Sequence, residues 1–134
     1  MILSSGIDLI EIGRIQKALE RHGERFLKRI FTDAEIIPLR SKRIATAEPR
    51  VIAAELAARF AAKEAASKAL GTGIGPISWQ EIEVLNEPSG KPTLRLSGKA
   101  AQIASILGYT SWSVSLTHSR DMAAAVVVCV GEEK

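Results

Sequence analysis

Cysteine, aromatic residues and long apolar runs are all scarce in this chain. Its 134 residues hold one cysteine, Cys129, which cannot pair within the chain, so a disulfide scaffold is excluded. The longest apolar run, residues 122–130, falls well short of the roughly 20 residues that a membrane-spanning helix needs. The first ten residues lack the basic start and the cleavage site of a secretion signal. These absences predict a cytoplasmic protein with a buried, reduced thiol and no membrane partner.

Several familiar catalytic signatures are missing as well. The sequence has no C-x-x-C pair, no G-x-S-x-G elbow and no Walker A loop. Two histidines, His22 and His118, are too few for a multi-histidine zinc site. A Ser-His-Asp triad can be drawn on paper, but nothing in the sequence selects its serine.

The composition that remains suits one globular domain over residues 1–134. The chain is 46% hydrophobic and 25% charged. At this length folding buries roughly two thirds of the surface of the unfolded chain, which is enough for a core without disulfides. Alanine is plentiful in residues 53–69 and 100–104, so helices that carry these segments can approach their neighbours closely.

Positive charge is concentrated near the start of the chain. Residues 1–50 hold ten Lys or Arg against seven Asp or Glu, and residues 51–134 hold eight of each. Between residues 14 and 29, six basic side chains face two acidic ones. A field of this sign attracts nucleic acid, a membrane surface or an acidic protein, although a solvated helix face explains it equally well.

The first half of the chain predicts a strand followed by helices. Residues 2–8 are typical of a short strand, and an apolar stripe at i, i+3 and i+7 predicts a helix over 9–21. Thr32 and Glu35 have the spacing of a capping box and open a short helix that ends near Pro38 or soon after. A long helix begins near Pro49 and stops at Gly71.

The second half changes to a strand period. Ser97 is expected to cap a helix that Gly108 ends. The expected segments are the strands 78–84, 92–96, 111–118 and 122–130 and the helix 98–107. The last strand is apolar enough to be central in its sheet. Together these elements predict an α+β fold in which an antiparallel sheet packs on one long helix.

Asp8 is the first candidate for chemistry. It stands at the end of the first predicted strand, three residues before Glu11. This spacing also fits a helix N-terminal box in which the aspartate caps and the glutamate closes. From the residues alone, the capping interpretation is favoured over a functional one.

Glu64 and Lys68 form the second candidate, one turn apart on the long helix. Such a pair is ordinarily a surface ion pair worth about 0.3 kcal/mol. Phe60 and the surrounding alanines, however, indicate a buried stretch, where charges need a partner or a metal. The glycine-rich segment 71–75, GTGIG, is the third candidate, because its backbone N–H groups can approach a phosphate closely. A helix stop and turn is the more common meaning of such a segment.

These features together permit, without requiring, magnesium-assisted phosphoryl chemistry. Mg²⁺ characteristically takes one or two carboxylates, several waters and substrate phosphate oxygens. A lysine one turn from a ligand can neutralise charge on the same phosphates.

The chain resembles the holo-[acyl-carrier-protein] synthases, small enzymes of the 4′-phosphopantetheinyl transferase family, over nearly its whole length. Their motifs occur here in the family's order, and the block at 59–74 is very specific. The matching segments are GIDLIEIGRI (6–15), F-T-x-x-E (31–35), RFAAKEAASKALGTGI (59–74), W-x-x-I-E-V (79–84), G-K-P (90–92) and SLTH followed by an AVVV strand (115–128). The resemblance implies the phosphopantetheinyl transferase fold and transfer of 4′-phosphopantetheine from coenzyme A to a serine of apo acyl carrier protein, with release of adenosine 3′,5′-bisphosphate.

By position in these motifs, the resemblance implies that Asp8 and Glu64 hold a Mg²⁺ that also grips the pyrophosphate of coenzyme A. Lys68 would neutralise charge that develops on the pyrophosphate, and is a candidate to protonate the leaving group. Glu64 itself, or a water on the metal, would take the proton of the carrier serine, and the sequence does not choose between them.

The same correspondence implies residues that bind coenzyme A and the carrier protein. Thr117 and His118 resemble residues near the 3′-phosphate, although a neutral core histidine is an equal alternative. The full set implied for coenzyme A is Lys68, Gly71, Thr72, Gly73, Ile74, Gly75, Gly90, Lys91, Pro92, Thr117 and His118. The basic helix would dock the acidic carrier protein through Arg14, Arg21 and Arg25. The family further implies a homotrimer with coenzyme A at the subunit interfaces.

Residues 41–50 depart from the resemblance, since this stretch is longer than the family leads one to expect. Arg43 and Arg50 are loose candidates for the 3′-phosphate.

Two other classes compete with the transferase. A basic nucleic-acid-binding domain is suggested by a pI near 9.2, but the segment 111–118 offers only Trp112 for stacking and the net charge of +3 is modest. A non-catalytic carrier-binding module would keep the basic helix and lack the metal site.

Overall fold

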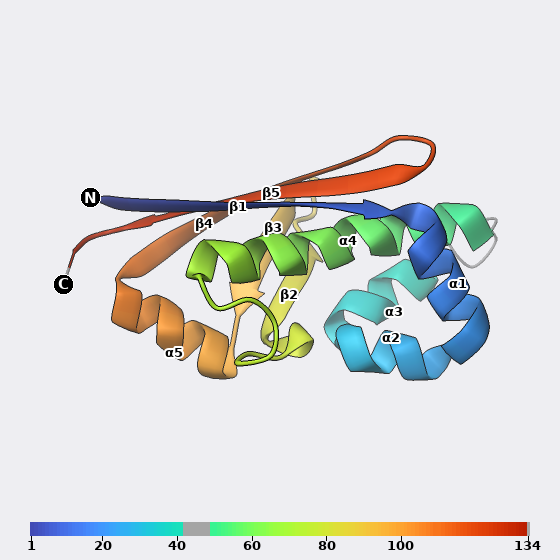
Figure 1. Ribbon diagram of the computed structural model, residues 1–134, viewed down its shortest axis with the longest axis horizontal. Coiled ribbons are helices and arrows are strands. Elements are labelled where there is room, and N and C mark those ends of the chain that lie inside the picture. Colours follow the sequence, from blue (N-terminus) through green and yellow to red (C-terminus); the bar gives the residue numbers. More distant parts are fainter. Residues whose placement is uncertain (42–48, 134) are drawn as a thin grey trace.

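The computed structural model describes residues 1–41 and 49–133, and in this part of the chain an antiparallel sheet lies along one long helix (Figure 1). The elements in chain order are β1 (Ile2–Glu11), α1 (Ile12–His22), α2 (Glu24–Ile30), α3 (Asp33–Ser41), α4 (Pro49–Leu70), the 3₁₀ turn η2 (Trp79–Glu81), β2 (Ile82–Asn86), β3 (Pro92–Leu96), α5 (Gly98–Leu107), β4 (Tyr109–His118) and β5 (Met122–Gly131). This arrangement confirms the predicted α+β class.

The main sheet has the strand order β1-β5-β4, with every neighbour antiparallel. Strand β5 is central, as its apolar sequence predicts, and Cys129 within it is buried. The register places Asp8 beside Ala125, and Ala125 beside Leu116. A second, two-stranded sheet pairs β2 with β3.

Alternation along β1 gives that strand two different faces. Ser4, Gly6 and Asp8 turn toward α4, and the Ser4 hydroxyl donates to the carbonyl of Ala69 at 2.7 Å. The odd-numbered side chains point away from the helix and are exposed, with Leu3 and Ile7 each at 65%. A two-residue period therefore separates a helix-facing side from an apolar outer side.

Helix α4 is the spine of the fold, and its alanines let the sheet come very close. A Cβ on Gly6 would fall 1.9 Å from the carbonyl oxygen of Ala65, so only glycine fits at that point of β1. Alanines at positions 53, 57, 61, 62, 65 and 66 of this helix are fully buried. The long-helix prediction is confirmed, and the contact fixes where β1 meets α4.

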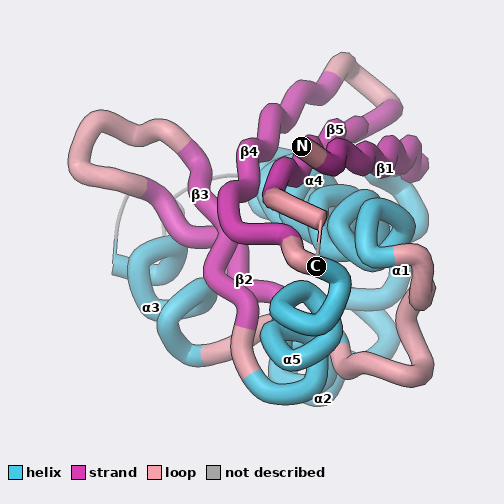
Figure 2. The backbone as a smooth tube through the Cα atoms, turned by 90° about the vertical axis from the view of Figure 1, so that its left-hand side faces the viewer, coloured by secondary structure: helices cyan, strands magenta, loops and turns pink. Residues whose placement is uncertain are grey.

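The helices α1, α2 and α3 gather around the N-terminal end of α4, and α5 lies beyond its other end (Figures 1 and 2). The apolar stripe of α1 is buried at Ile12 and Ile15, as predicted. The helix starts later than expected, however, because β1 continues to pair with β5 as far as Glu11 and Met122. Asp8 therefore lies inside a strand, and its interpretation as a helix cap is wrong.

The predicted caps are only partly correct. Glu35 Oε1 accepts the backbone N–H of Thr32 at 3.0 Å, but the Thr32 hydroxyl donates instead to Glu83 Oε2 at 2.5 Å. Ser97 makes no side-chain cap to α5. Glu81 takes that role, because its Oε2 accepts the backbone N–H groups of Lys99 and Ala100.

The sequence predicts an extended conformation throughout segment 78–84, and this prediction is wrong for the first part of the segment. Ser78 and Glu81 form a capping box around η2, and the strand begins only at Ile82. Gly108 ends α5 in the left-handed conformation, as predicted, with φ at 92°.

Candidate functional site

Asp8, Glu64 and Lys68 come together where β1 crosses α4. Lys68 Nζ lies 3.2 Å from Asp8 Oδ1 and donates to the Ile7 carbonyl at 2.9 Å. Glu64 stands one turn before Lys68, so both side chains project from the same side of α4. The structure thus brings a carboxylate of the first strand close to a carboxylate and an ammonium of the long helix, the three residues that the family resemblance groups together.

Local packing explains this meeting. The Ser4 and Gly6 contacts hold β1 against the C-terminal half of α4, and Asp8 is the next residue on the same face of the strand. The Asp8 side chain is 18% exposed and that of Lys68 is 52% exposed, so the group opens to solvent. The expectation that this stretch is buried holds for the alanines but not for Lys68.

The electrostatics of the group favour an additional cation. Burial raises the pKa of Glu64 above its usual value, and the negative charge of Asp8 raises it further, whereas Lys68 acts in the opposite direction. Two carboxylates that repel each other in this way are stabilised by a cation between them. No group of three or more metal-ligating side chains occurs among residues 1–41 and 49–133. Within the described residues the carboxylates that the site offers to a divalent ion are those of Asp8 and Glu64.

The glycine-rich segment follows directly on Lys68. The backbone N–H groups of Thr72 and Gly73 bond to the Ser67 carbonyl at 3.1 and 3.2 Å. Gly71, Gly73 and Gly75 all have positive φ, and a Cβ on any of them would meet open space. The segment is thus both a helix stop, as its more common meaning suggests, and an open backbone surface beside Lys68.

A second group of predicted residues lies elsewhere. A pocket of about 280 Å³ is lined by Gly90 and Pro92 from the β2–β3 hairpin and by Thr117 and His118 at the end of β4. His118 is exposed, so its interpretation as a core histidine is wrong. Lys91 is exposed between two residues that line this pocket.

Arg59 and Glu55, which sequence reasoning missed, complete the wall of this pocket. Arg59 donates to Glu55 Oε2 at 2.8 Å, and its side chain is only 7% exposed. A buried arginine in a concave site is a strong anion ligand. In the sequence, Arg59 could have been recognised as a candidate from its position at the start of the motif 59–74.

Within one chain the two groups do not meet. Residues five and nine apart on an α-helix lie about 140° and 180° around its axis. Arg59 is therefore turned to the opposite side of α4 from Glu64 and Lys68. The carboxylates and the pocket occupy different sides of the same helix.

The basic side chains predicted to bind the carrier protein lie on α1 and α2. Arg14, Arg21 and Arg25 are exposed, and none of them makes an ion pair with another residue in the described ranges. Arg14 and Arg21 are seven residues apart and share one face of α1. Of the other basic candidates, Arg50 binds Asp121 at 2.7 Å, and Arg43 lies outside the described residues, as does most of the stretch 41–50.

Lys63 and Glu35 form a buried ion pair that the sequence did not reveal. Both side chains are 0% exposed, and Lys63 Nζ lies 2.7 Å from Glu35 Oε1. Burial lowers the pKa of Lys63, and the charge of Glu35 opposes that change. The alanine-rich surroundings of Lys63 were a signal of burial, but nothing in the sequence identified its partner across 28 positions.

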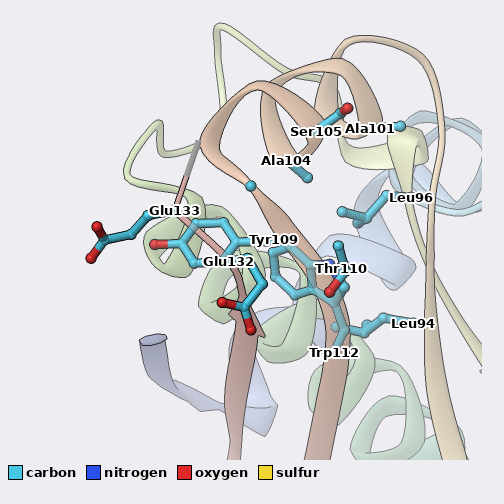
Figure 3. Close-up of a pocket in the computed structure, with 11 residues that line it drawn as sticks. Leu94, Leu96, Ala101, Ala104, Ser105, Tyr109, Thr110, Trp112, Glu132 and Glu133 are labelled. Carbon is cyan, nitrogen blue, oxygen red and sulfur yellow. The ribbon is translucent and has the colours of Figure 1, made fainter. Parts of the chain in front are cut away.

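A larger apolar pocket lies at the other end of the sheet and contains none of the predicted residues (Figure 3). Its volume is about 430 Å³, and Tyr109 and Trp112 form an edge-to-face pair in its wall. Glu132 and Glu133 stand at its margin.

Comparison with known proteins gives consistent results. The sequence matches the 4′-phosphopantetheinyl transferase superfamily over residues 4–127. It is 49% identical to a holo-[acyl-carrier-protein] synthase of Herpetosiphon aurantiacus, with 97% of this chain and 100% of the relative covered. The relative from Koribacter versatilis is 48% identical, with 96% and 98% covered.

Solved structures agree in fold. The coenzyme A complex of Helicobacter pylori holo-[acyl-carrier-protein] synthase matches with a TM-score of 0.78 at 33% identity, over 94% of this chain and 99% of the other. The Bacillus anthracis enzyme, in complex with CoA (3′,5′-ADP), matches with a TM-score of 0.75 at 36% identity, over 96% of both chains. With a matching sequence and fold, this chain belongs to the 4′-phosphopantetheinyl transferase superfamily, as an enzyme of the holo-[acyl-carrier-protein] synthase kind.

Proposed function

We propose that residues 1–134 form one domain that transfers 4′-phosphopantetheine from coenzyme A to a serine of apo acyl carrier protein, with Mg²⁺, and releases adenosine 3′,5′-bisphosphate. The observation that carries this proposal is the meeting of Asp8, Glu64 and Lys68 on β1 and α4. The coenzyme A complexes of the Helicobacter pylori and Bacillus anthracis relatives support the choice of donor substrate.

The donor set fits Mg²⁺ that is shared with a phosphate substrate. Asp8 and Glu64 supply two carboxylates whose mutual repulsion a cation would relieve. Mg²⁺ usually keeps several waters and binds through one or two carboxylates and substrate phosphates. When bound, the ion supplies charge neutralisation and orientation at the pyrophosphate.

The protein side chains account for the rest of the transfer. The serine oxygen attacks the phosphorus that carries the pantetheine, and the bond from that phosphorus to the bridging oxygen breaks as the nucleotide leaves. Lys68 is half exposed and can turn from Asp8 to the pyrophosphate, where its charge offsets the charge that develops. Glu64 is the carboxylate placed to accept the serine proton, either directly or through one water.

The coenzyme would extend from this group along the glycine-rich segment. The open backbone of segment 71–75 lets phosphate oxygens approach without steric hindrance, although the N–H groups of Gly71, Thr72, Gly73 and Gly75 already bond to carbonyls of the chain. The pocket with Pro92, Thr117, His118 and Arg59 suits the 3′-phosphate, because it combines a buried guanidinium with polar side chains.

Complete sites would form between copies of the chain. The pocket and the carboxylates lie on opposite sides of α4, so one coenzyme can contact both only if two chains contribute. The outer face of the sheet exposes Leu3, Ile7 and Leu9, which is an apolar surface suited to self-association. We therefore propose sites shared between chains, in the homotrimer that the family resemblance implies.

The exposed face of α1 with Arg14 and Arg21, continued by Arg25 on α2, would receive the acidic carrier protein. The three residues of β1 that follow Asp8 lead straight to α1 and place this basic face next to the carboxylates. The setting is the cytoplasm, where the unpaired Cys129 thiol stays reduced. Among the described helices none is long and apolar enough to cross a membrane.

Intact-mass measurement tests the proposal. The purified chain is incubated with a competent apo carrier protein, coenzyme A and Mg²⁺, and the carrier should gain one phosphopantetheinyl group. Glu64→Gln should abolish this gain and spare carrier binding, which separates the transferase from a non-catalytic module. An unmodified carrier that a known transferase can load would contradict the proposal, and tight, salt-dependent binding of DNA or RNA would favour a nucleic-acid-binding protein.

A further inference from the structure

The buried Lys63 ammonium uses all three of its N–H donors. It donates to Glu35 Oε1 at 2.7 Å and to the carbonyls of Trp79 at 3.0 Å and Ile82 at 2.6 Å. The Phe31 ring covers it at 5.2 Å. Lysine has three donors and no acceptor, so this side chain is saturated and held in one place.

Both carboxylate oxygens of Glu35 are bonded as well. Its Oε1 also accepts the backbone N–H of Thr32, and its Oε2 accepts the backbone N–H of Val84 at 3.0 Å. Through these bonds the pair connects the start of α3, the middle of α4 and the strand β2. No buried side-chain polar atom in the described residues lacks a partner.

This junction holds the far end of the segment 71–78, which we call the glycine loop. The loop leaves α4 at Leu70 and returns at Trp79, whose carbonyl Lys63 binds and whose ring stacks on Phe60 at 4.6 Å. At the near end, Thr72 and Gly73 bond to Ser67. Between them Gly71, Gly73 and Gly75 have no neighbours near the Cβ position. The loop is therefore held at both ends, and Ile77 anchors it in between, because its side chain is buried and its carbonyl accepts the N–H of Gly75.

Stability alone does not explain a pair of this kind. Apolar side chains of similar volume often replace a buried ion pair with no loss of stability, since the desolvation of two charges offsets their attraction. Lys63 stands next to Glu64 in sequence, and its ammonium binds the carbonyls of Trp79 and Ile82 in the segment through which the chain returns from the glycine loop.

We propose that Lys63 and Glu35 are positioning residues that hold the glycine loop in register with Glu64 and Lys68 for coenzyme A binding. This inference rests on the proposed function, since it takes coenzyme A as the ligand of the loop. Neither side chain reaches solvent, so neither touches the substrate. The carrier-binding face on α1 is not part of the junction.

The test separates loop position from general stability. In Lys63→Met, the Michaelis constant for coenzyme A should rise by about tenfold or more, because small misplacements of binding groups cost large factors. The Michaelis constant for carrier protein should stay within twofold. Val127→Ala in the centre of β5 is the matched control, because it lowers the melting temperature by opening the core and should leave both constants unchanged. All assays are run at a temperature where each variant is folded by circular dichroism.

Hydrogen exchange provides a readout that needs no activity. Lys63→Met should speed amide exchange in residues 71–78 and leave β5 protected, whereas a purely structural role would speed exchange everywhere. If Lys63→Met does not fold, Glu35→Gln carries the same two measurements. The inference is overturned if a folded variant has a Michaelis constant for coenzyme A within twofold of the wild-type value. It is also overturned if the amides of Thr72 and Gly73 in the wild type exchange as fast as those of a free peptide. Failure of the wild type to load a competent carrier would instead count against the proposed function.

Discussion

Lys68 is bonded to Asp8, with Nζ 3.2 Å from Oδ1, although the two residues lie 60 positions apart in the chain. The ammonium also donates a hydrogen bond to the Ile7 carbonyl, so it occupies the space between β1 and α4. Both side chains retain access to solvent. The pair is therefore weak as a stabilising contact and well placed to be rearranged by a ligand.

The first prediction concerns this pair. Asp8→Asn should lower kcat/KM for carrier loading by about a hundredfold or more, because the change removes charge from a site that stabilises a charged transition state. The melting temperature should change little, since exposed ion pairs contribute about 0–1 kcal/mol. Steady-state kinetics and thermal unfolding measure the two effects. Glu133→Gln, which neutralises a carboxylate far from this group, is the control and should retain activity, whereas full activity in Asp8→Asn would contradict the assignment.

Gly6 gives a second prediction about the same crossing. Gly6→Ala places a Cβ 1.9 Å from the Ala65 carbonyl oxygen, so β1 must move away from α4. The variant should lose about 1–3 kcal/mol of unfolding free energy from overpacking, and carrier loading should fall because Asp8 moves with the strand. Gly13→Ala is the matched control, since nothing lies within 4 Å of its Cβ position. On helix α1 that change should be neutral or stabilising by up to about 1 kcal/mol. Chemical denaturation distinguishes the two variants, and equal stabilities would refute the close contact.

The sequence predicts only part of this crossing of β1 and α4. The proximity of Glu64 to Lys68 follows from helix spacing, whereas Asp8 was identified by its position in the family motif. The end of β1 was misjudged because local pattern favours a helix from residue 9, while the pairing of Glu11 with Met122 is decided by a strand far along the chain. The Lys63–Glu35 pair was missed for the same reason, since the partner of a buried charge is a tertiary property. From the local sequence, Glu35 could be recognised only as part of a helix cap.

A third prediction uses Glu81, which caps α5 from a distant turn. Hydrogen bonds from the Ser78 backbone, and from Lys99 and Ala100, hold its pKa below the usual value. A depressed pKa means that the stabilisation is present above the unfolded pKa, 4.5, and is lost as pH falls through the lower folded value. Glu81→Gln should therefore cost about 1 kcal/mol at neutral pH and progressively less below pH 4.5. Urea denaturation of both proteins across this range measures the difference, and a gap independent of pH would contradict it.

The basic face of α1 supports a fourth prediction. Reversing the charge of Arg14 and Arg21 together should raise the Michaelis constant for carrier protein by about tenfold or more and leave that for coenzyme A unchanged, because rim charges act on encounter with an acidic partner. The increase should shrink at high salt. Lys99→Glu on α5 is the control for reversal of a charge outside this face, to be compared with the single Arg14→Glu variant, and it should have little effect. An unchanged carrier constant in the double variant would remove this face from the docking site.

A fifth prediction follows from the position of Arg59 and His118 on the far side of α4 from Glu64. If complete sites form between chains, Glu64→Gln and the double variant Thr117→Ala/His118→Ala are each inactive alone but complement each other when co-expressed. Random assembly gives a site with both halves intact in about a quarter of cases, so the mixture should recover about a quarter of wild-type activity. Adding Leu9→Lys to both chains should abolish recovery, because it charges the apolar outer face of β1. Light scattering should find three 14.4 kDa chains in the active mixture and fewer after that change. A mixture no more active than its separate parts would mean that each chain builds its site alone, and that coenzyme A does not bridge the two sides of α4.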